Sequence, residues 1–573
     1  MNALEHQDSP LTVDVLVVGS GTGMAAALAA HEKGLSVLVV EKTDLVGGST
    51  ARSGGAFWIP GNGVLKRDGA VLPRAQTETY LDSVVGDSAP RERYLSFLDH
   101  GPAAVEMLER TTALRFFWNK GYADYFPDVP GGDEEGSTCE ARPFDLRRLG
   151  EEQARLRRGD VESPLPMPVT GFDYKWVNLM MKTPLKSWPV ILKRLAQGIG
   201  GVLLGRRYVA GGQAIAAGMF DGLIRAGVPV WTEAEVTGLV ETNGRVTGAT
   251  VQRQGRRVGI RARRGVILAA GGFDHNMRMR ATYQSSSLTE DMSLGAPGNV
   301  GDGIFLGQDV GAELRSMHEA WWFPAVRPIK GYPPILLAER FLPGSLIVNG
   351  RGRRFVNEAL GYMAFGQTVL RLEREGRAVG QMWLVFDQEY RNSYLLAGSI
   401  FPRQPLRQDW YDAGIAVKAD TPEQLALAAG LPASAFVDQL QRYNGMAAAG
   451  VDTEFSRGGN AYDRYYGDPT VKPNPNLRAL SGTLYAVKLV LSDLGTCGGL
   501  AADGRARVLR QDGTPIRGLY AIGNNAGNAF GRAYPGAGGT IGQGITFGYI
   551  AVEDMFADRS WETCAGPEEG ACS

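Results

Sequence analysis

A glycine-rich stretch near the C-terminal end holds the residues with the clearest chemical potential. A short apolar run, 519–522, leads into glycine and asparagine, and residues 534–542 then combine Tyr534 and a proline with several glycines. Ordered glycine costs chain entropy, so this density is expected where backbone must approach a flat ligand and present its N–H groups. A helix-like run, 544–555, follows, so the loop leads into a helix N-terminus that favours negative charge. The simpler alternative is a surface turn with a packing tyrosine.

The N-terminal part of the chain has the pattern of a nucleotide-binding unit. An apolar run over 13–18 predicts a buried strand that leads directly into the glycine turn 19–23. An alanine-rich helix over 24–33 and a second strand over 36–40 follow, and the second strand ends at Glu41. A strand, glycine turn, helix, strand and acidic residue in this order bind an adenine dinucleotide.

Two positions of this unit carry specific expectations. Glu41 is expected to accept hydrogen bonds from the ribose hydroxyls, and its negative charge argues against a 2′-phosphate. Met24 stands where the third glycine of the usual pattern is expected. We therefore expect Gly23 to provide the close packing of helix against strand instead.

Further strands and glycine pairs indicate that the α/β pattern continues. A helix over 212–226 and a strand over 228–232 precede two or three β-like runs, which are separated at Asn243-Gly244 and Gln254-Gly255. The Asn-Gly pair is a strong hairpin signal. The segment closes with the strand 265–272, whose paired glycines we expect beside the nucleotide.

The central part of the chain has a different texture, rich in aromatic residues, prolines and loops. We predict a discontinuous Rossmann-like dinucleotide-binding domain of α/β class over 1–290 and 475–573, with an α+β substrate-capping domain over 291–474 inserted into it. The nucleotide-binding domain is expected to resume at Leu484. A proline-rich and then amphipathic segment near 160–205 resembles a separate insertion.

Composition excludes several classes of function. The net charge is −1 with no long basic run, so nucleic acid is not an expected partner. Glycine supplies 77 of 573 residues, roughly twice the average usage of about 7%. The four cysteines (Cys139, Cys497, Cys564 and Cys572) form no CxxC pair, so neither a disulfide framework nor a zinc site is predicted, and no metal site is expected from five scattered histidines.

The glycine loops together resemble the fumarate reductase and succinate dehydrogenase-like flavoprotein superfamily over essentially the whole chain. The cluster 46–55, Val-Gly-Gly-Ser-Thr-Ala-Arg-Ser-Gly-Gly, is the most informative, because such a loop follows the pyrophosphate and flavin in that superfamily. Some members bond FAD covalently to a histidine; none occurs between His31 and His100, so noncovalent FAD is implied. The implied cofactor contacts are Gly19, Ser20, Gly21, Gly23, Met24, Glu41, Lys42, Gly48, Ser49, Thr50, Ser53, Gly54, Gly55, Ala270, Gly271, Gly523, Asn524, Gly539, Thr540 and Ile541.

Finer matches resemble the 3-ketosteroid dehydrogenases, above all the Δ1-dehydrogenases. They are the loop 124–132, the run 342–362, the strand 518–524 and the loop 533–541, of which the last is the most specific. The word steroid comes from this resemblance, because composition and spacing alone do not indicate it. A cap rich in Trp, Phe, Pro and Met suits a hydrophobic polycyclic substrate.

The resemblance implies a role for each residue of the site. Tyr534 and the backbone N–H of Gly538 would donate hydrogen bonds to the 3-oxo oxygen as the ketone gains enolate character. Tyr362 would remove the C2 proton, and Tyr125 would hydrogen-bond to Tyr362 and ease its ionisation, since a free tyrosine has a pKa of about 10. The flavin N5 would accept the C1 hydride, and an external acceptor, a quinone or another carrier, would reoxidise it. Without the resemblance, Tyr122 and Tyr125 would be interpreted as packing residues.

Three alternatives remain open at this point. A soluble fumarate reductase would need histidine and arginine to clamp two carboxylates, for which His275, His318 and Arg532 are available. A 3-ketosteroid Δ4-(5α)-dehydrogenase shares the flavin loops, although the three tyrosines favour the Δ1 reaction. A flavin-binding protein without chemistry, whose cap docks lipid or protein, would not need acid–base tyrosines.

The location of the protein is also an expectation. The N-terminus 1–10 is polar, without the apolar core of a secretory signal, so we expect a cytoplasmic protein. The run 188–204 is interrupted by Lys193, Arg194 and Gln197, which makes it too charged and too short to cross a bilayer. It could form an entrance, a lid or a patch that contacts a membrane surface.

Overall fold

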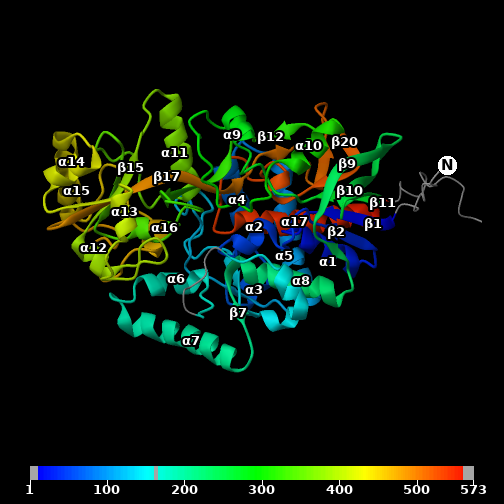
Figure 1. Ribbon diagram of the computed structural model, residues 1–573, viewed down its shortest axis with the longest axis horizontal. Coiled ribbons are helices and arrows are strands. Elements are labelled where there is room, and N and C mark those ends of the chain that lie inside the picture. The colour runs from blue at the N-terminus through cyan, green and yellow to red at the C-terminus, as the bar shows by residue number, and fades with distance from the viewer. Residues whose placement is uncertain (1–10, 160–165, 559–573) are drawn as a thin grey trace, which may run out of the picture.

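The structure, a computed structural model, describes residues 11–159 and 166–558. The expectations for residues 1–10 and for Cys564 and Cys572 lie outside these ranges. Figure 1 shows an elongated molecule in which the strands β1, β2 and β11 lie toward one end and β15, α14 and α15 toward the other. Helix α7 projects below the body.

The first of the two large sheets has eight strands in the order β19-β20-β10-β11-β1-β2-β8, with β9 paired to β10. β1 pairs in parallel with both β2 and β11, and β11 pairs in parallel with β20. These central strands are apolar and buried, as expected for a parallel sheet covered on both faces. The strands are β1 (Leu11–Val18), β2 (Val37–Val40), β8 (Val230–Trp231), β9 (Ala234–Thr242), β10 (Arg245–Arg253), β11 (Arg256–Leu268), β19 (Arg507–Leu509) and β20 (Pro515–Ala521).

The hairpin predicted at Asn243-Gly244 is confirmed, and the separation at Gln254-Gly255 proves to be a second hairpin. β9 and β10 pair antiparallel around Asn243-Gly244, and β10 and β11 pair antiparallel around Gln254-Gly255. Both residues of each turn have positive φ, 51° and 71° in the first and 50° and 76° in the second. Such turns match the right-handed twist of the strands they join.

Helices cover the large sheet, and their glycines decide how closely they pack. α17 begins at Gly539, five residues before the predicted start at 544, so part of the expected loop is helix. A Cβ atom at Gly542 would lie 2.5 Å from the carbonyl oxygen of Trp58, and one at Gly544 would lie 2.5 Å from the Thr22 hydroxyl. These glycines let α17 (Gly539–Ala557) pack closely, which outweighs the usual cost of glycine within a helix. The other helices of this part are α1 (Gly23–Glu32), α2 (Gly48–Arg52), α3 (Gly63–Arg67), α4 (Arg74–Val85), α5 (Arg91–Thr111), α8 (Gly211–Arg225), α9 (Met277–Tyr283) and α10 (Asp302–Asp309).

A second, five-stranded sheet forms the core of the cap in the order β13-β17-β15-β14, with β16 paired to β17. Its strands are β13 (Ala320–Val326), β14 (Ser345–Val348), β15 (Met382–Asp387), β16 (Ala416–Ala419) and β17 (Leu484–Thr496). The helices around it are α11 (Tyr362–Arg374), α12 (Gln388–Ser393), α13 (Gln408–Asp412), α14 (Pro422–Ala429), α15 (Ala433–Ala449) and α16 (Ala461–Tyr465), with the 3-10 turn η2 (Glu339–Phe341).

The placement of β17 corrects the expectation that the nucleotide-binding part resumes at Leu484. β17 pairs antiparallel with β13, β15 and β16, so it is a central strand of the cap sheet. The chain returns to the large sheet only with β19 and β20. We therefore propose that the second crossover between the two domains follows Thr496 rather than residue 474.

Smaller elements connect the two lobes. A three-stranded sheet, β3-β5-β4, lies beside α17, and the two-stranded β6–β7 frames the insertion. The insertion contains α6 (Gly171–Asn178) and α7 (Pro184–Leu203). The remaining elements are β3 (Ala56–Trp58), β4 (Phe116–Trp118), β5 (Thr138–Ala141), β6 (Phe144–Asp145), β7 (Tyr208–Val209), β12 (Leu314–Arg315), β18 (Gly499–Leu500), η1 (Leu146–Arg155) and η3 (Gly523–Asn525).

Candidate active site

A continuous cavity of about 890 Å³ extends from the carboxyl ends of β1, β2 and β11 to the cap. Ligands bind at this edge of parallel sheets, where the strands end and the helices begin. The cavity wall includes Tyr125, Tyr362, Tyr534 and Gly538, as well as all but three of the predicted cofactor residues. One cavity therefore joins the expected cofactor site to the expected catalytic residues.

Three predicted cofactor residues do not line the cavity. Met24 is fully buried in the apolar core between α1 and the sheet. A Cβ atom at Gly23 would lie 2.9 Å from Val17 and 3.0 Å from Ala269, so Gly23 has the close-packing role expected of it. Gly539 is the first residue of α17 and lies against the Tyr534 ring.

The turn after β1 can accept only glycine at its first position. Gly19 has φ of 108°, and a Cβ atom there would lie 2.2 Å from the carbonyl oxygen of Ala269. Thr22, which the sequence analysis did not assign, also lines the cavity; its place between Gly21 and Gly23 is the signal that could have identified it. The turn brings bare backbone to the cavity at the N-terminal end of α1, where an anion is favoured.

The acidic residue at the end of β2 is held in a fixed position. The Glu41 carboxylate accepts hydrogen bonds from the Ser20 hydroxyl at 2.7 Å and from the Thr43 backbone N–H at 3.0 Å. Lys42, the next residue, forms an ion pair with Asp302 across the cavity wall. A fixed carboxylate at this position fits the ribose of an adenine nucleotide.

The second glycine cluster forms the opposite wall. Gly47 and Gly48 have positive φ, and a Cβ atom at Gly55 would lie 2.0 Å from the carbonyl carbon of Gly211. The Ser49 hydroxyl accepts a hydrogen bond from the Asn299 amide at 2.9 Å. The sequence analysis did not assign Asn299; its place in the glycine-rich run 295–303 is the signal that could have identified it. Backbone from two chain segments therefore approaches the cavity where the extended body of FAD would fit.

We expect Gly19→Ala to weaken FAD binding by about tenfold or more, which corresponds to ~1.4 kcal/mol. The new Cβ atom would displace the carbonyl of Ala269, whose residue lines the same cavity. The measurement is a titration of the apoprotein with FAD. Gly445→Ala is the matched control, because its Cβ atom would meet nothing within 4 Å in helix α15. Equal affinities for the two variants would refute the assignment of the turn.

Three tyrosines from distant segments meet at the cap end of the cavity. The ring centres of Tyr125 and Tyr362 are 5.5 Å apart, and each lies 5.2 Å from the ring centre of Tyr534. Tyr125 follows β4, Tyr362 is the first residue of α11, and Tyr534 precedes α17. Trp321 and Phe323 of β13 pack against Tyr534 and Tyr362 respectively. The structure thus brings together the three residues that the resemblance singled out.

Two hydrogen-bond donors converge beside these rings. The backbone N–H of Gly538 donates to the Tyr534 hydroxyl at 3.2 Å, and the Thr540 hydroxyl lies 3.3 Å from the same oxygen. Gly538 has φ of 92°, and a Cβ atom there would lie 2.2 Å from the carbonyl oxygen of Ala56. A ligand oxygen that accepts from both Tyr534 and Gly538 would meet the geometry of an oxyanion hole.

Burial makes the phenols of this cluster hard to ionise. It raises the pKa of Tyr362 and of Tyr125 well above the ordinary value, and that of Tyr122 to about 12. The Tyr125 phenol lies close enough to lower the pKa of Tyr362, but its hydroxyl has no aligned hydrogen-bond partner among the described residues. The hydrogen bond expected between the two is therefore not formed here, because their rings meet edge to face.

The residues needed for a dicarboxylate clamp lie elsewhere. Arg532 forms an ion pair with Glu319 at 3.1 Å, and His275 forms one with Asp291 at 2.7 Å. The His318 side chain is half exposed and lies 3.6 Å from Glu319. None of the four described histidines (His31, His100, His275 and His318) lines the cavity, a finding consistent with FAD held without a covalent histidine link.

The chain belongs to the flavoprotein family defined by the FAD binding domain, which matches residues 14–541. It is also similar over nearly its whole length to enzymes that oxidise ring ketones. It is 44% identical to the 3-oxosteroid 1-dehydrogenase of Mycolicibacterium smegmatis, an alignment that covers 95% of this chain and 97% of that protein.

Two further relatives show how far the similarity extends. The chain is 33% identical to the 4-oxocyclohexanecarboxylate 2-dehydrogenase of Sinomonas cyclohexanicum, over 98% of this chain and 95% of the relative. The structure of the 3-ketosteroid Δ1-dehydrogenase of Sterolibacterium denitrificans, in complex with 1,4-androstadiene-3,17-dione, matches with a TM-score of 0.89 and 37% identity. This match covers 95% of this chain and 99% of that one, so the predicted fold class is confirmed.

Proposed function

We propose that this protein is an FAD-dependent 3-oxosteroid 1-dehydrogenase, which introduces a double bond between C1 and C2 of a 3-ketosteroid. The observation that carries the proposal is the meeting of Tyr125, Tyr362, Tyr534 and the Gly538 N–H at one end of the FAD cavity. The similarity to 3-oxosteroid 1-dehydrogenases over nearly the whole chain supports the same reaction.

The residues of the site divide the reaction between them. Tyr534 and the Gly538 N–H donate hydrogen bonds to the 3-oxo oxygen, so they stabilise the negative charge that develops there. This charge makes the C2 proton more acidic, and the Tyr362 oxygen accepts that proton. Bound FAD supplies the acceptor for the hydride that leaves C1. An external electron acceptor, a quinone or another carrier, completes the cycle.

The lining of the cavity supports a hydrophobic substrate. Apolar side chains from the cap and from the insertion contribute to its wall, among them Met167, Val169, Phe323, Ile335 and Leu337. The arginines on the wall, Arg157 and Arg207, lie just before and just after the insertion 160–205 in sequence and do not belong to the tyrosine cluster. A soluble fumarate reductase would need cations beside its catalytic residues, so this arrangement disfavours that alternative.

A substrate panel tests the proposal and separates the remaining alternatives. We expect a 4-ene-3-ketosteroid to bleach the flavin absorbance under anaerobic conditions much faster than 4-oxocyclohexanecarboxylate does. A 5α-reduced 3-ketosteroid that is oxidised at C4–C5 instead would indicate the Δ4 reaction. Reoxidation of the reduced protein by fumarate would indicate a fumarate reductase.

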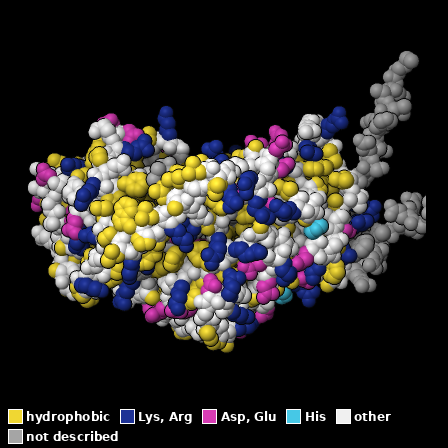
Figure 2. Space-filling model, turned by 90° about the horizontal axis from the view of Figure 1, so that it is seen from below, with side chains coloured by type: hydrophobic (Ala, Val, Ile, Leu, Met, Phe, Trp, Pro, Cys, Tyr) yellow, Lys and Arg dark blue, Asp and Glu magenta, His cyan; other side chains and the backbone are white. Residues whose placement is uncertain are grey.

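We also propose that helix α7 brings the protein to a membrane surface. No helix among the described residues is long and apolar enough to cross a bilayer. In α7, however, Leu185 is 92% exposed and Leu203 is 81% exposed. The other exposed apolar side chains here are Met181, Trp188, Leu192, Ile199, Val202 and Leu204. Figure 2, a view from below, shows hydrophobic side chains gathered on the underside with Lys and Arg side chains around them.

The charge of this segment suits an anionic lipid surface. The sequence contains no acidic residue between Asp173 and Asp221, whereas Lys186, Lys193 and Arg206 lie in the same interval. An amphipathic helix with apolar and basic side chains lies in the membrane interface. Gly198 and Val202 of α7 also line the cavity, so a hydrophobic substrate could pass from the lipid to the site.

The double variant Leu185→Glu and Leu192→Glu is expected to bind vesicles that contain anionic phospholipid about 100-fold more weakly, since each buried leucine contributes roughly 1.5–3 kcal/mol. Both side chains are exposed, so the fold should be retained. Co-sedimentation with vesicles is the measurement. Leu427→Glu, at an equally exposed position of α14 in the cap, is the control. Unchanged sedimentation of the double variant would reject the proposal.

A further inference from the structure

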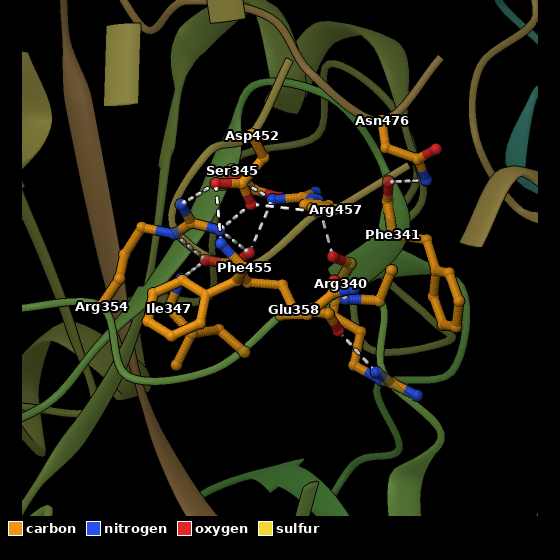
Figure 3. Close-up of polar contacts among 12 residues, drawn as sticks. Arg340, Phe341, Ser345, Ile347, Arg354, Glu358, Asp452, Phe455, Arg457 and Asn476 are labelled. Atoms are coloured by element: carbon orange, nitrogen blue, oxygen red, sulfur yellow. Dashed lines mark hydrogen bonds and ion pairs between the residues drawn. The ribbon is translucent and has the colours of Figure 1, made fainter. Parts of the chain in front are cut away.

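A buried arginine holds the chain just before Tyr362. Arg340, in the turn η2, is fully buried, and its Nη1 atom donates hydrogen bonds to the carbonyl oxygens of Glu358 and Leu360. Figure 3 shows the Arg340 guanidinium, which donates to the Glu358 carbonyl oxygen, turned away from Arg354 and Arg457. Leu360 is two residues before Tyr362, where α11 begins. Arg340 therefore fixes the segment that delivers the Tyr362 side chain.

Arg340 differs from the arginines around it because no carboxylate in the described part of the chain forms an ion pair with it. Arg354 pairs with Glu358 at 2.7 Å and with Asp452 at 2.7 Å. Arg457 Nη1 lies 3.4 Å from Oε2 of Glu358, the oxygen that Arg354 Nη2 also contacts. No described carboxylate forms an ion pair with Arg340, and its Nε and Nη2 atoms have no hydrogen-bond partner within the described residues. A guanidinium remains charged in proteins, so a positive charge without a direct carboxylate partner lies here, and it acts on the pKa of the nearby Asp463 carboxyl in the lowering direction.

This charge lies against the tyrosine cluster. Arg340 lies over the Phe341 ring at 4.5 Å, and the Phe341 ring is 5.5 Å from that of Tyr462. The Tyr462 ring lies 4.6 Å from Tyr125, which in turn contacts Tyr362. Burial raises the pKa of Tyr462 well above its ordinary value, while the neighbouring Arg340 acts in the opposite direction.

Such a charge would favour proton removal by Tyr362. A buried phenol is costly to ionise, and the neighbouring phenols would disfavour a negative charge among them further. A cation in a low-dielectric interior offsets this cost over several ångströms. Arg340 is the guanidinium next to the cluster that forms no ion pair with a described carboxylate.

We propose that Arg340 is a positioning residue for the reaction. Its Nη1 atom holds the chain before Tyr362. Its positive charge, beside Tyr462 and Tyr125, stabilises the Tyr362 phenolate electrostatically. This inference rests on the proposed 1-dehydrogenase function. The titratable and charged groups that face Arg340 or the cluster are Tyr122, Tyr125, Glu339, Glu358, Tyr362, Arg457, Tyr462, Asp463 and Tyr534.

The test is the pH dependence of anaerobic flavin reduction by a 4-ene-3-ketosteroid. The rate rises with pH as the base loses its proton, so a raised pKa moves this rise to higher pH. We expect Arg340→Gln to move it upward by about one unit, which is about tenfold in rate near neutral pH and is regained at high pH. Arg340→Lys, which keeps the charge, should leave the rise near the wild-type position.

A matched control separates charge from structural support. Arg391 is also buried and donates to the carbonyl oxygens of Tyr394, Phe401 and Gln404, but it does not contact the tyrosine cluster. Arg391→Gln should lower the melting temperature without moving the pH profile. Affinity for 1,4-androstadiene-3,17-dione, a non-reacting 3-oxosteroid, should change little in Arg340→Gln, because this residue does not line the cavity.

Two results would overturn the inference. One is an Arg340→Gln profile that falls equally at every pH, which would indicate structural support alone. The other result applies if Arg340→Gln does not fold. In that case Tyr462→Phe, which removes only a hydroxyl without a hydrogen-bond partner among the described residues, should shift the pH profile upward by a smaller amount. An unshifted profile in Tyr462→Phe would contradict the proposal. If no 3-ketosteroid reduces the flavin of the wild-type protein, the proposed function itself is refuted.

Discussion

Tyr362→Phe is expected to slow flavin reduction by a 3-ketosteroid by about 10²–10⁴-fold, the range typical for loss of a general base. The ring would still pack against Tyr125, Tyr534 and Phe323, so neither the fold nor FAD content should change. Only the oxygen that accepts the C2 proton is removed. Anaerobic stopped-flow measurement of flavin bleaching reports this step directly.

The control for this variant is Tyr443→Phe. Tyr443 is buried in the cap away from the cavity, and its hydroxyl has no hydrogen-bond partner among the described residues. Its loss should leave the rate unchanged. A Tyr362→Phe protein that retains FAD and reacts within threefold of the wild-type rate would remove Tyr362 from the proposed role.

Tyr534→Phe is expected to lower the rate of flavin reduction by about 10²–10³-fold, the usual effect of one lost oxyanion donor. The Gly538 N–H would remain as the second donor, which is why some activity should survive. Because the hydrogen bond strengthens as charge develops on the 3-oxo oxygen, kcat should fall more than KM rises.

The affinity for a 3-oxosteroid that does not react checks this explanation. If Tyr534 acts chiefly in the transition state, the Kd of 1,4-androstadiene-3,17-dione should rise less than tenfold in Tyr534→Phe. A loss that lies entirely in binding, with kcat unchanged, would show that Tyr534 holds the ground state rather than the developing enolate.

The local patterns of the nucleotide-binding part were predictable because they depend on neighbours in sequence. The strand–turn–helix at Gly19 and the two hairpins follow from glycine positions and apolar periodicity. The convergence of Tyr125, Tyr362 and Tyr534 was different in kind. Their spacing in the sequence does not predict that they meet in one site. Only the resemblance to known dehydrogenases indicated this before the structure showed it.

Errors arose where distant packing decides the outcome. We expected the nucleotide-binding domain to resume at Leu484, but sequence could not say which sheet this segment joins, and β17 proved to lie in the cap. The glycines of α17 suggested a loop because their tight contacts with Trp58 and Thr22 are invisible in sequence. Arg340 gave no signal, since most arginines are exposed and its burial depends on the cap being assembled.

The most direct test of the account is anaerobic mixing of the purified FAD-bound protein with 4-androstene-3,17-dione, followed by identification of the product. We predict bleaching of the flavin with one equivalent of the 1,4-diene-3-one formed per flavin reduced. Absence of bleaching, or a product unsaturated at any other position, would contradict the assignment of the tyrosine cluster to C1–C2 dehydrogenation.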